Sequence, residues 1–178
     1  MHASSRILAG VLLLASPAAF AQSSSATVSV PASARIYKPI TLVLNNGGLS
    51  FGDVFADASG DVTLNPQSNA RTTTGPALAA TGTANPAIFT VGGKRNASYA
   101  ITLPANGTVT LTGPGTAMAV SNFTASVAGT APASSATGLI PDSAGATQTF
   151  KVGATLTLGA SQADGDYSGT FNVTVAYN

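Results

Sequence analysis

Few residues in this chain of 178 have side chains that commonly carry out catalysis or bind metals. The only histidine is His2, and the chain has no cysteine and no tryptophan. All six acidic residues are aspartates, so glutamate is absent as well. With no histidine beyond position 2 and no cysteine, the chain cannot form a Ser/His/Asp triad, a Cys/His dyad, or a zinc or haem site of the usual kinds. The sequence therefore predicts a protein that is not an enzyme and binds no cofactor.

Five of the six aspartates fall into two groups with regular spacing. Asp53, Asp57 and Asp61 recur every four residues, and Asp164 and Asp166 flank a glycine. Calcium needs roughly six to eight oxygen ligands, and neither group has the ligand order of a known calcium loop. Two carboxylates can also flank a glycosidic bond, but no tryptophan platform accompanies them. We interpret these aspartates as turn-forming residues and predict no metal site and no catalytic residue.

The charge balance also limits the classes of partner. Arg6 is one of seven basic residues and lies in the leader described below, so six basic residues remain against six aspartates. A chain of zero net charge has no electrostatic footprint for nucleic acid or for an anionic membrane surface. Lys94 and Arg95 follow two glycines, which indicates a solvated turn; the alternative is a contact with an anionic sugar or a carboxylate. We expect Arg71 to anchor a loop through hydrogen bonds to backbone carbonyls or to an aspartate.

Residues 1–21 have the features of a secretory signal peptide. Arg6 precedes an apolar stretch, Ile7 to Ala15, and Ala19 and Ala21 form an A-x-A cleavage site. The apolar stretch is shorter than the ~18 residues of a membrane span, and no lipobox cysteine follows it. We predict export to the periplasm and then to the cell surface or medium, and a single domain over residues 22–178 with no membrane span.

The remaining chain is rich in Thr, Val, Ala and Gly and alternates in the manner of β-strands. From Tyr167 to Tyr177 every second residue falls on one apolar face, and Thr147 to Leu158 alternates in the same way. We expect residues 159–165 to join these two strands as a hairpin loop. Ala128 to Ala146 is predicted to be an irregular surface loop. The fold class predicted is an all-β antiparallel sandwich. Shorter strands are predicted around 49–54, 62–64, 87–91, 98–103, 108–111 and 118–127.

The segment 26–36 alternates as well. Val28, Val30, Ala34 and Ile36 lie on one side of it, and small polar residues occupy most of the other side. One interpretation is the first strand of the chain's own sandwich. The other is a strand that is donated to a neighbouring copy and completes that copy's sheet. Pro31 disfavours a long strand paired on both edges, because proline has no amide proton.

The C-terminal segment resembles the end of a pilus subunit of the chaperone/usher type. In that class a glycine fourteen residues from the end, alternating apolar residues and a penultimate tyrosine form the strand that a periplasmic chaperone grips. The positions that match here are Gly165, Phe171, Val173, Val175 and Tyr177.

Over nearly the whole chain after the leader, the sequence resembles a secreted bacterial family catalogued as domain of unknown function 4402. The resemblance implies an immunoglobulin-like, pilin-like sandwich and brings no activity and no catalytic residues. The start of this part also resembles cysteine-free pilins of alternative chaperone/usher systems, on Thr27 to Val30 and Pro39 to Leu42. The recurring sequence motifs that carry this resemblance lie at 49–52, 61–66, 71–75, 86–91, 99–104, 152–158 and 169–178.

These observations predict a structural subunit of a surface fimbria, a pilus or a similar homopolymer. Its partners are copies of itself and, by the resemblance, a periplasmic chaperone and an outer-membrane usher. The alternative is a monomeric binding module that attaches to surface glycan or to an envelope protein through the loop 128–146. Tyr37, Tyr99 and Tyr167 are the aromatic residues expected outside the core for such binding. The contact residues predicted for subunit or chaperone binding are Val28, Val30, Ala34, Ile36, Gly165, Phe171, Val173, Val175 and Tyr177.

Overall fold

The computed structural model describes residues 24–178 apart from residue 76 and residues 79–81. The chain divides into two units, residues 1–35 and residues 36–178. In the first unit, residues 24–35 are exposed and contain neither strand nor turn. The predicted signal peptide, residues 1–21, lies outside the described residues. In the part of the chain that is described, no helix is long and apolar enough to cross a membrane.

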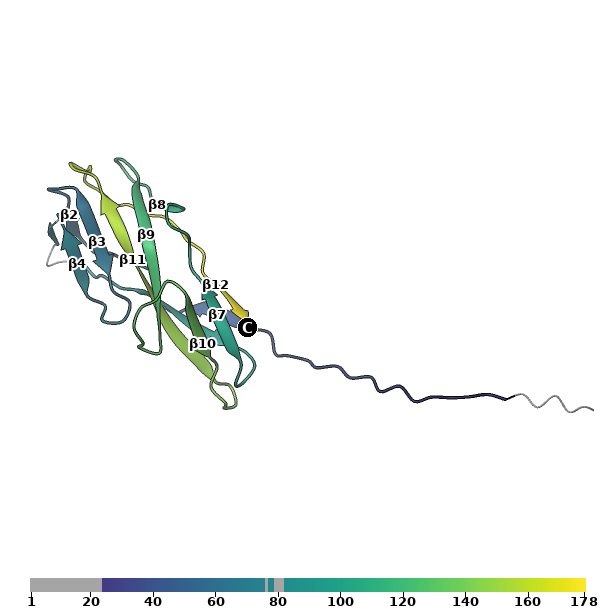
Figure 1. Ribbon diagram of the computed structural model, residues 1–178. Helices are drawn as coiled ribbons and strands as arrows, with labels where there is room; N and C mark the ends of the chain where they lie inside the picture. The colour runs from purple at the N-terminus through teal and green to yellow at the C-terminus, as the bar shows by residue number, and fades with distance from the viewer. Residues whose placement is uncertain (1–23, 76, 79–81) are drawn as a thin grey trace, which may run out of the picture. The chain divides into compact units, whose positions relative to one another are not determined.

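The second unit is built around one long strand, β11 (Thr147–Leu158), in a sheet of seven strands (Figure 1). One edge of β11 pairs first with β6 (Ala87–Gly92) and then with β3 (Gly60–Leu64). The other edge pairs with β9 (Met118–Val127), and every pairing is antiparallel. The sheet is extended by β1 (Thr41–Leu44) on β6, β4 (Arg71–Thr74) on β3 and β8 (Val109–Leu111) on β9.

Gly153 marks the point on β11 where the pairing changes from β6 to β3. A Cβ atom at this glycine would lie 2.2 Å from the carbonyl oxygen of Leu64 and 2.8 Å from the ring of Pro66. The backbone that leaves β3 crosses β11 at this point, so the position accepts no side chain.

The second layer is a three-stranded antiparallel sheet. Its strands are β10 (Ala136–Leu139), β7 (Ser98–Thr102) and β12 (Thr174–Tyr177), with β7 in the middle (Figure 1). A separate two-stranded ribbon joins β2 (Val54–Phe55) to β5 (Ala77–Leu78). The described residues contain no helix. The expected all-β antiparallel sandwich is therefore confirmed.

The core is formed by the inward residues of both sheets, as the alternation predicts. In β3 the side chains of Val62 and Leu64 are buried, and Thr63 between them is exposed. Phe89 and Phe150 stack across β6 and β11 with their ring centroids 5.1 Å apart. Aromatic burial of this kind contributes strongly to the stability of a small domain, because apolar area removed from water is the main favourable term in folding.

The prediction of a last strand over 167–177 is wrong in extent. The strand β12 begins only at Thr174, and Ser168 forms one isolated bridge with Thr112. The predicted hairpin is also wrong, because β11 and β12 lie in different sheets. The stretch 159–173 crosses from one sheet to the other, and alternation cannot reveal this because it does not specify the pairing partner.

Two further predictions need correction. The stretch 128–146 is not wholly irregular, because it contains β10 and a bridge between Ala133 and Ala125. The predicted strand over 49–54 is reduced to a bridge at Ser50 and the short β2. The strands β1 and β4 were not predicted, since β1 follows a proline by two residues and β4 is almost entirely threonine.

Candidate functional site

A groove with an apolar floor and polar side chains along its walls opens between the first and the last segments of the folded unit. One wall is formed by residues 47–56, which follow β1, and the other by residues 163–171, which precede β12. The groove has a volume of about 890 Å³. Its floor is made of apolar side chains that belong to the core of the sandwich or pack against it. These floor residues are Val109, Leu111, Met118, Val120, Leu156 and Leu158.

The first wall is held from its outer side. Asn46 directly precedes it and donates its side-chain amide to the carbonyl oxygen of Pro86 at 2.9 Å. Further along, Nη1 of Arg71 donates to the carbonyl oxygens of Phe51 and Asp53, both at 2.9 Å. The expectation that Arg71 anchors a loop through backbone carbonyls is therefore confirmed. These bonds fix the wall against β6 and β4, away from the opposite wall.

The second wall is also held from its outer side. Ser168 and Thr112 exchange backbone hydrogen bonds at 2.9 Å. The Tyr167 hydroxyl donates to the carbonyl oxygen of Ala163 and accepts from the amide of Gly115, at 2.9 and 2.8 Å. Among the described residues, no backbone hydrogen bond joins the two walls.

The predicted contact residues of the C-terminal segment line or continue the second wall. Gly165 lines the groove in a positive-φ conformation, at +135°. Phe171 also lines it, and its ring lies 5.0 Å from that of Phe123. Val173, Val175 and Tyr177 follow at every second position, half-buried and packed on the core. Their alternation confirms the predicted inward face, although β12 itself is short.

The strand β12 is the edge of its sheet. Val175 pairs with Ile101 of β7, and in the described part of the chain no ladder covers the opposite edge of β12. An edge strand presents unpaired N–H and C=O groups that can pair with another chain. The lining of the groove ends at Phe171, three residues before this edge strand begins at Thr174.

Tyr177 ties the beginning of the folded unit to its end. Its hydroxyl donates to the carbonyl oxygen of Lys38 and accepts from the amide of Lys94, both at 2.7 Å. A Cβ atom on Gly93 would lie 2.3 Å from this hydroxyl, so the contact requires glycine there. Nζ of Lys94 lies 4.1 Å from the ring centroid of Tyr37, within the range of a cation–π contact. The stretch before β1 is thus fixed at the C-terminal end of β12.

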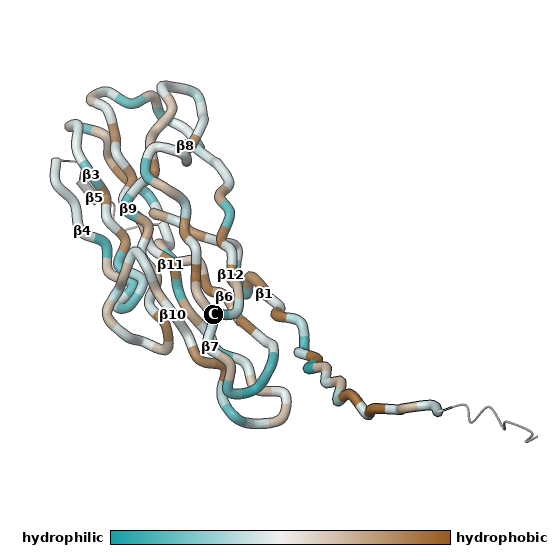
Figure 2. Tube along the Cα trace, turned by 45° about the vertical axis from the view of Figure 1, so that its right-hand side comes forward, coloured by the Kyte–Doolittle hydropathy of each residue, from teal (hydrophilic) through white to brown (hydrophobic). Residues whose placement is uncertain are grey.

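The segment 24–36, which we call the arm, carries the other predicted contact residues. Val28, Val30 and Ile36 are 81%, 78% and 94% exposed, and Ala34 is exposed as well. Figure 2 shows hydrophobic positions recurring along this segment. No described residue of the arm lies in a strand.

The expectation that Tyr99 lies outside the core is wrong. Its side chain is 0% exposed, and its hydroxyl donates to Oε1 of Gln148 at 3.0 Å. Burial raises the pKa of Tyr99 to about 12. Tyr167 is half-buried, and its hydroxyl is already used by the second wall. Of the three tyrosines considered for glycan binding, only Tyr37 is well exposed.

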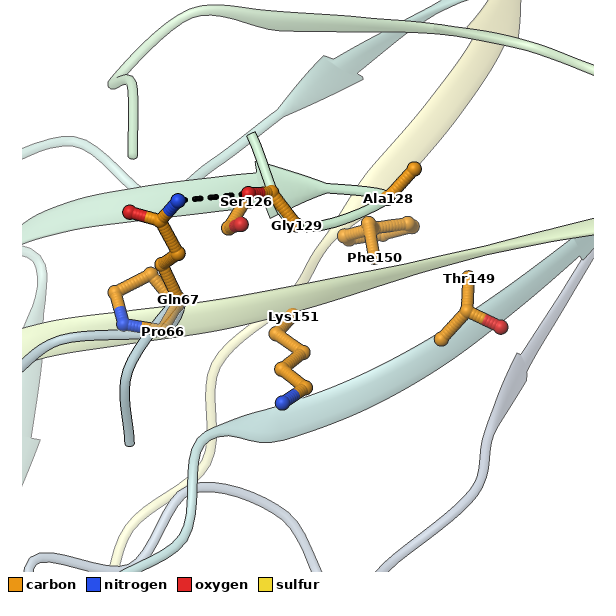
Figure 3. Close-up of a pocket in the computed structure, with 8 residues that line it drawn as sticks. All are labelled: Pro66, Gln67, Ser126, Ala128, Gly129, Thr149, Phe150 and Lys151. Atoms are coloured by element: carbon orange, nitrogen blue, oxygen red, sulfur yellow. Dashed lines mark hydrogen bonds between the residues drawn. The ribbon is translucent and has the colours of Figure 1, made fainter. Parts of the chain in front are cut away.

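A second, smaller cavity lies beside β9 and β11 (Figure 3). It has a volume of about 270 Å³ and is lined by Pro66, Phe150 and six other residues. Its polar groups bond within the chain: Nε2 of Gln67 donates to the carbonyl oxygen of Gly129 at 2.7 Å, and Oγ of Ser126 donates to that of Thr130 at 2.6 Å. We assign it no ligand.

The charged residues of the described part of the chain mostly lie apart from one another. No group of three or more His, Cys, Asp or Glu side chains there is placed to hold a metal ion. Arg95 forms an exposed ion pair with Asp142 at 3.9 Å. The groove offers a ligand apolar contacts at its floor and polar side chains along its walls.

Sequence reasoning missed the first wall. Leu49, Phe51 and Val54 face the groove from a stretch that contains almost no regular strand. The sequence predicts a short strand around 49–54 and a family motif at 49–52, and neither signal places this stretch beside a groove. Its apolar spacing signals burial, but the opposing wall is more than a hundred residues away in the sequence, so no local signal could identify the groove.

A family model described as Domain of unknown function (DUF4402) matches residues 42–177. The matched range contains both walls and β12 and begins after the arm. Comparisons with curated proteins and with solved structures found no match.

Proposed function

The chain belongs to the family described as Domain of unknown function (DUF4402), and from its groove and arm we propose that it is a structural subunit of a surface fimbria or similar homopolymer, assembled by β-strand donation. In this proposal the arm of one copy enters the groove of the next. The observation that carries the proposal is the presence, in one chain, of a groove with an apolar floor that leads toward the edge strand β12 and of an arm whose apolar residues alternate and are exposed.

In this proposal the arm supplies the groove with an additional strand and with apolar side chains that cover its floor. A donated strand would place its apolar side chains on the floor at every second position and its backbone against the free edge of β12. Burying Val28, Val30 and Ile36 is worth about 1.5–3 kcal/mol for each side chain. Covering the floor adds apolar area, and the ladder adds hydrogen bonds. These gains offset the loss of translational freedom on association, which costs about 4–15 kcal/mol.

The stretch that joins the arm to β1 favours donation to another copy. Residues 36–40 contain no turn, and Pro39 holds its own φ near −65° and keeps Lys38 extended. The carbonyl oxygen of Lys38 is bonded to the hydroxyl of Tyr177. An extended stretch before β1 favours an arm that continues outward to another copy over an arm that folds back into the same copy.

The proposal extends to assembly outside the cell. Residues 1–21 direct export, a periplasmic chaperone covers the groove during transit, and a neighbouring arm replaces it with the help of an usher. The low charge of the chain, 7% of its residues, supports a protein that packs against its own copies, because charged side chains are a common defence against sheet-edge pairing. The proposal assigns no catalytic activity.

The test compares the mature chain with a variant that lacks residues 22–36. Native mass and thermal unfolding are measured for both, and for the variant mixed with a peptide of residues 24–36. We expect polymers from the mature chain, monomers from the variant, and a rise in melting temperature when the peptide is added. A matched peptide with Val28 and Val30 replaced by serine should raise it little. A monomeric mature chain whose stability is unchanged by the truncation would overturn the proposal.

A further inference from the structure

The charged residues of the folded unit are divided between its two ends. The strand β11 has 12 residues, so its ends lie about 36 Å apart. Lys94 and Arg95 follow β6 at the end where Gly92 pairs with Thr147. Lys38 joins them there, because the Tyr177 hydroxyl bonds both its carbonyl and the amide of Lys94. We call this the basic end; its charged side chains are three cations and one carboxylate, Asp142, which pairs with Arg95.

The opposite end carries most of the carboxylates. Asp61 lies there because it pairs with Thr157, near the end of β11. Asp53, Asp164 and Asp166 line the groove, and Asp57 lies in the turn before β3. We call this the acidic end; it holds five carboxylates and one cation, Arg71. Asp164 and Asp166 are exposed and form no ion pair with any described residue.

The chain therefore has almost no net charge, but its positive and negative side chains are separated along the direction of the strands. Lys151 lies on β11 between the two ends and donates to Oδ1 of Asn69. Such a charge separation has no effect on the fold of one copy, because the two ends are several Debye lengths apart at physiological salt. It matters where two copies meet end to end.

We propose that consecutive copies in the polymer meet with the basic end of one against the acidic end of the next. This inference rests on the proposed strand donation. The arm leaves the folded unit at the basic end, where Lys38 is fixed to Tyr177. Only residues 37–40 separate the arm from β1, so a donor whose arm fills a groove must place its basic end close to that groove.

The charge pattern also determines the direction of the donated strand. If residue 36 of the donor lies at the acidic end of the groove, Lys38, Lys94 and Arg95 face Asp53, Asp164 and Asp166. If the arm enters in the other direction, the basic ends of both copies come together and repel. The favoured direction is antiparallel to β12, which is also the direction of the other pairings in that sheet.

Charge reversal in the full mature chain tests the inference. One variant carries Asp164→Lys and Asp166→Lys, a second carries Lys38→Glu and Lys94→Glu, and a third carries all four substitutions. Polymer growth is followed by light scattering at low salt. We expect each two-residue variant to grow about tenfold more slowly, because every junction then opposes like charges. The four-residue variant should recover much of the rate, since its junctions are attractive again.

Lys151→Glu is the matched control, because it reverses a charge away from both ends; we expect its growth rate to stay within about twofold of the unchanged chain. Growth of the unchanged chain should also slow as salt is raised. Equal growth of all variants at low and high salt would overturn the inference.

A peptide-binding experiment distinguishes a failure of strand donation from a failure of the end-to-end contact. A peptide of residues 24–34 has no charged side chain. It is titrated against the full chain carrying Val28→Ser and Val30→Ser, with and without the Asp164 and Asp166 reversals. Similar binding to both, with reversal effects only on growth, supports the inference. Absence of binding to either overturns the proposed function, whereas binding without any charge effect on growth overturns only the end-to-end contact.

Discussion

Replacing Val28 and Val30 by serine tests strand donation without touching the folded unit. Both valines lie on the same face of the arm, and both are largely exposed in the single chain, at 81% and 78%. Burial of a valine side chain is worth about 1.5–3 kcal/mol, and serine loses most of that gain. The double substitution should therefore weaken association by about 3–6 kcal/mol. Since every 1.4 kcal/mol is tenfold, this corresponds to about 100-fold to 10,000-fold in the dissociation constant.

The measurement needs two readouts from the same sample. Sedimentation of the mature chain over a range of concentrations gives the strength of association. Urea unfolding of the monomer gives its free energy of unfolding, which we expect to change by less than about 0.5 kcal/mol, because exposed positions outside the packed core contribute little. The two readouts separate loss of assembly from loss of folding.

The matched control replaces Thr27 and Ser29 by alanine. These residues alternate with the valines and fall on the opposite face of the arm. We expect association to change less than about threefold. If both double variants weaken association equally, the arm does not bind as a strand with one buried face. If neither does, the arm is not the donated segment, and the reasoning from the groove is refuted.

Three further predictions concern the folded unit. Tyr177→Phe removes the hydroxyl that bonds both Lys38 and the chain at residue 94, and should lower the free energy of unfolding by about 1–2 kcal/mol in urea titrations. Gly153→Ala should destabilise by more than about 2 kcal/mol, because its Cβ meets backbone at 2.2 Å, whereas Gly159→Ala, whose nearest contact is at 3.7 Å, should be nearly neutral in the same assay. Burial raises the pKa of Tyr99 from 10.0 to about 12, so the unfolded chain loses this proton first and the free energy of unfolding should fall as pH rises from about 10 to 12. Tyr99→Phe should show a smaller slope over that pH range, and an unchanged slope would contradict the assignment.

Some of the site followed directly from sequence. The alternation from Phe171 to Tyr177 identified an inward face, because side chains of a strand point to opposite sides at every residue. The apolar face of the arm was visible for the same reason. Arg71 was expected to bond backbone carbonyls, and it does so at Phe51 and Asp53.

Other features of the structure could not be predicted from alternation or residue type within a short segment. The alternating stretches that end at Leu158 and begin at Tyr167 suggested a hairpin, but β12 pairs with β7 in the other sheet. Tyr99 carries a polar hydroxyl, which led to the expectation of an exposed side chain. Inside the sandwich this hydroxyl donates to Gln148, so the side chain can be fully buried. Such outcomes depend on partners that are distant in sequence.

Composition and alternation were enough to establish the fold class, the absence of histidine and cysteine beyond position 2, and the alternating pattern of the arm and of the last segment. These properties are local, since composition and a period of two residues do not depend on what packs against them. The tertiary structure alone decided that residues 47–56 and 163–171 are held apart over an apolar floor, and that the charges separate toward opposite ends. Both features arise when antiparallel pairing brings distant segments together, and this pairing is fixed by packing of the whole sandwich rather than by any single strand.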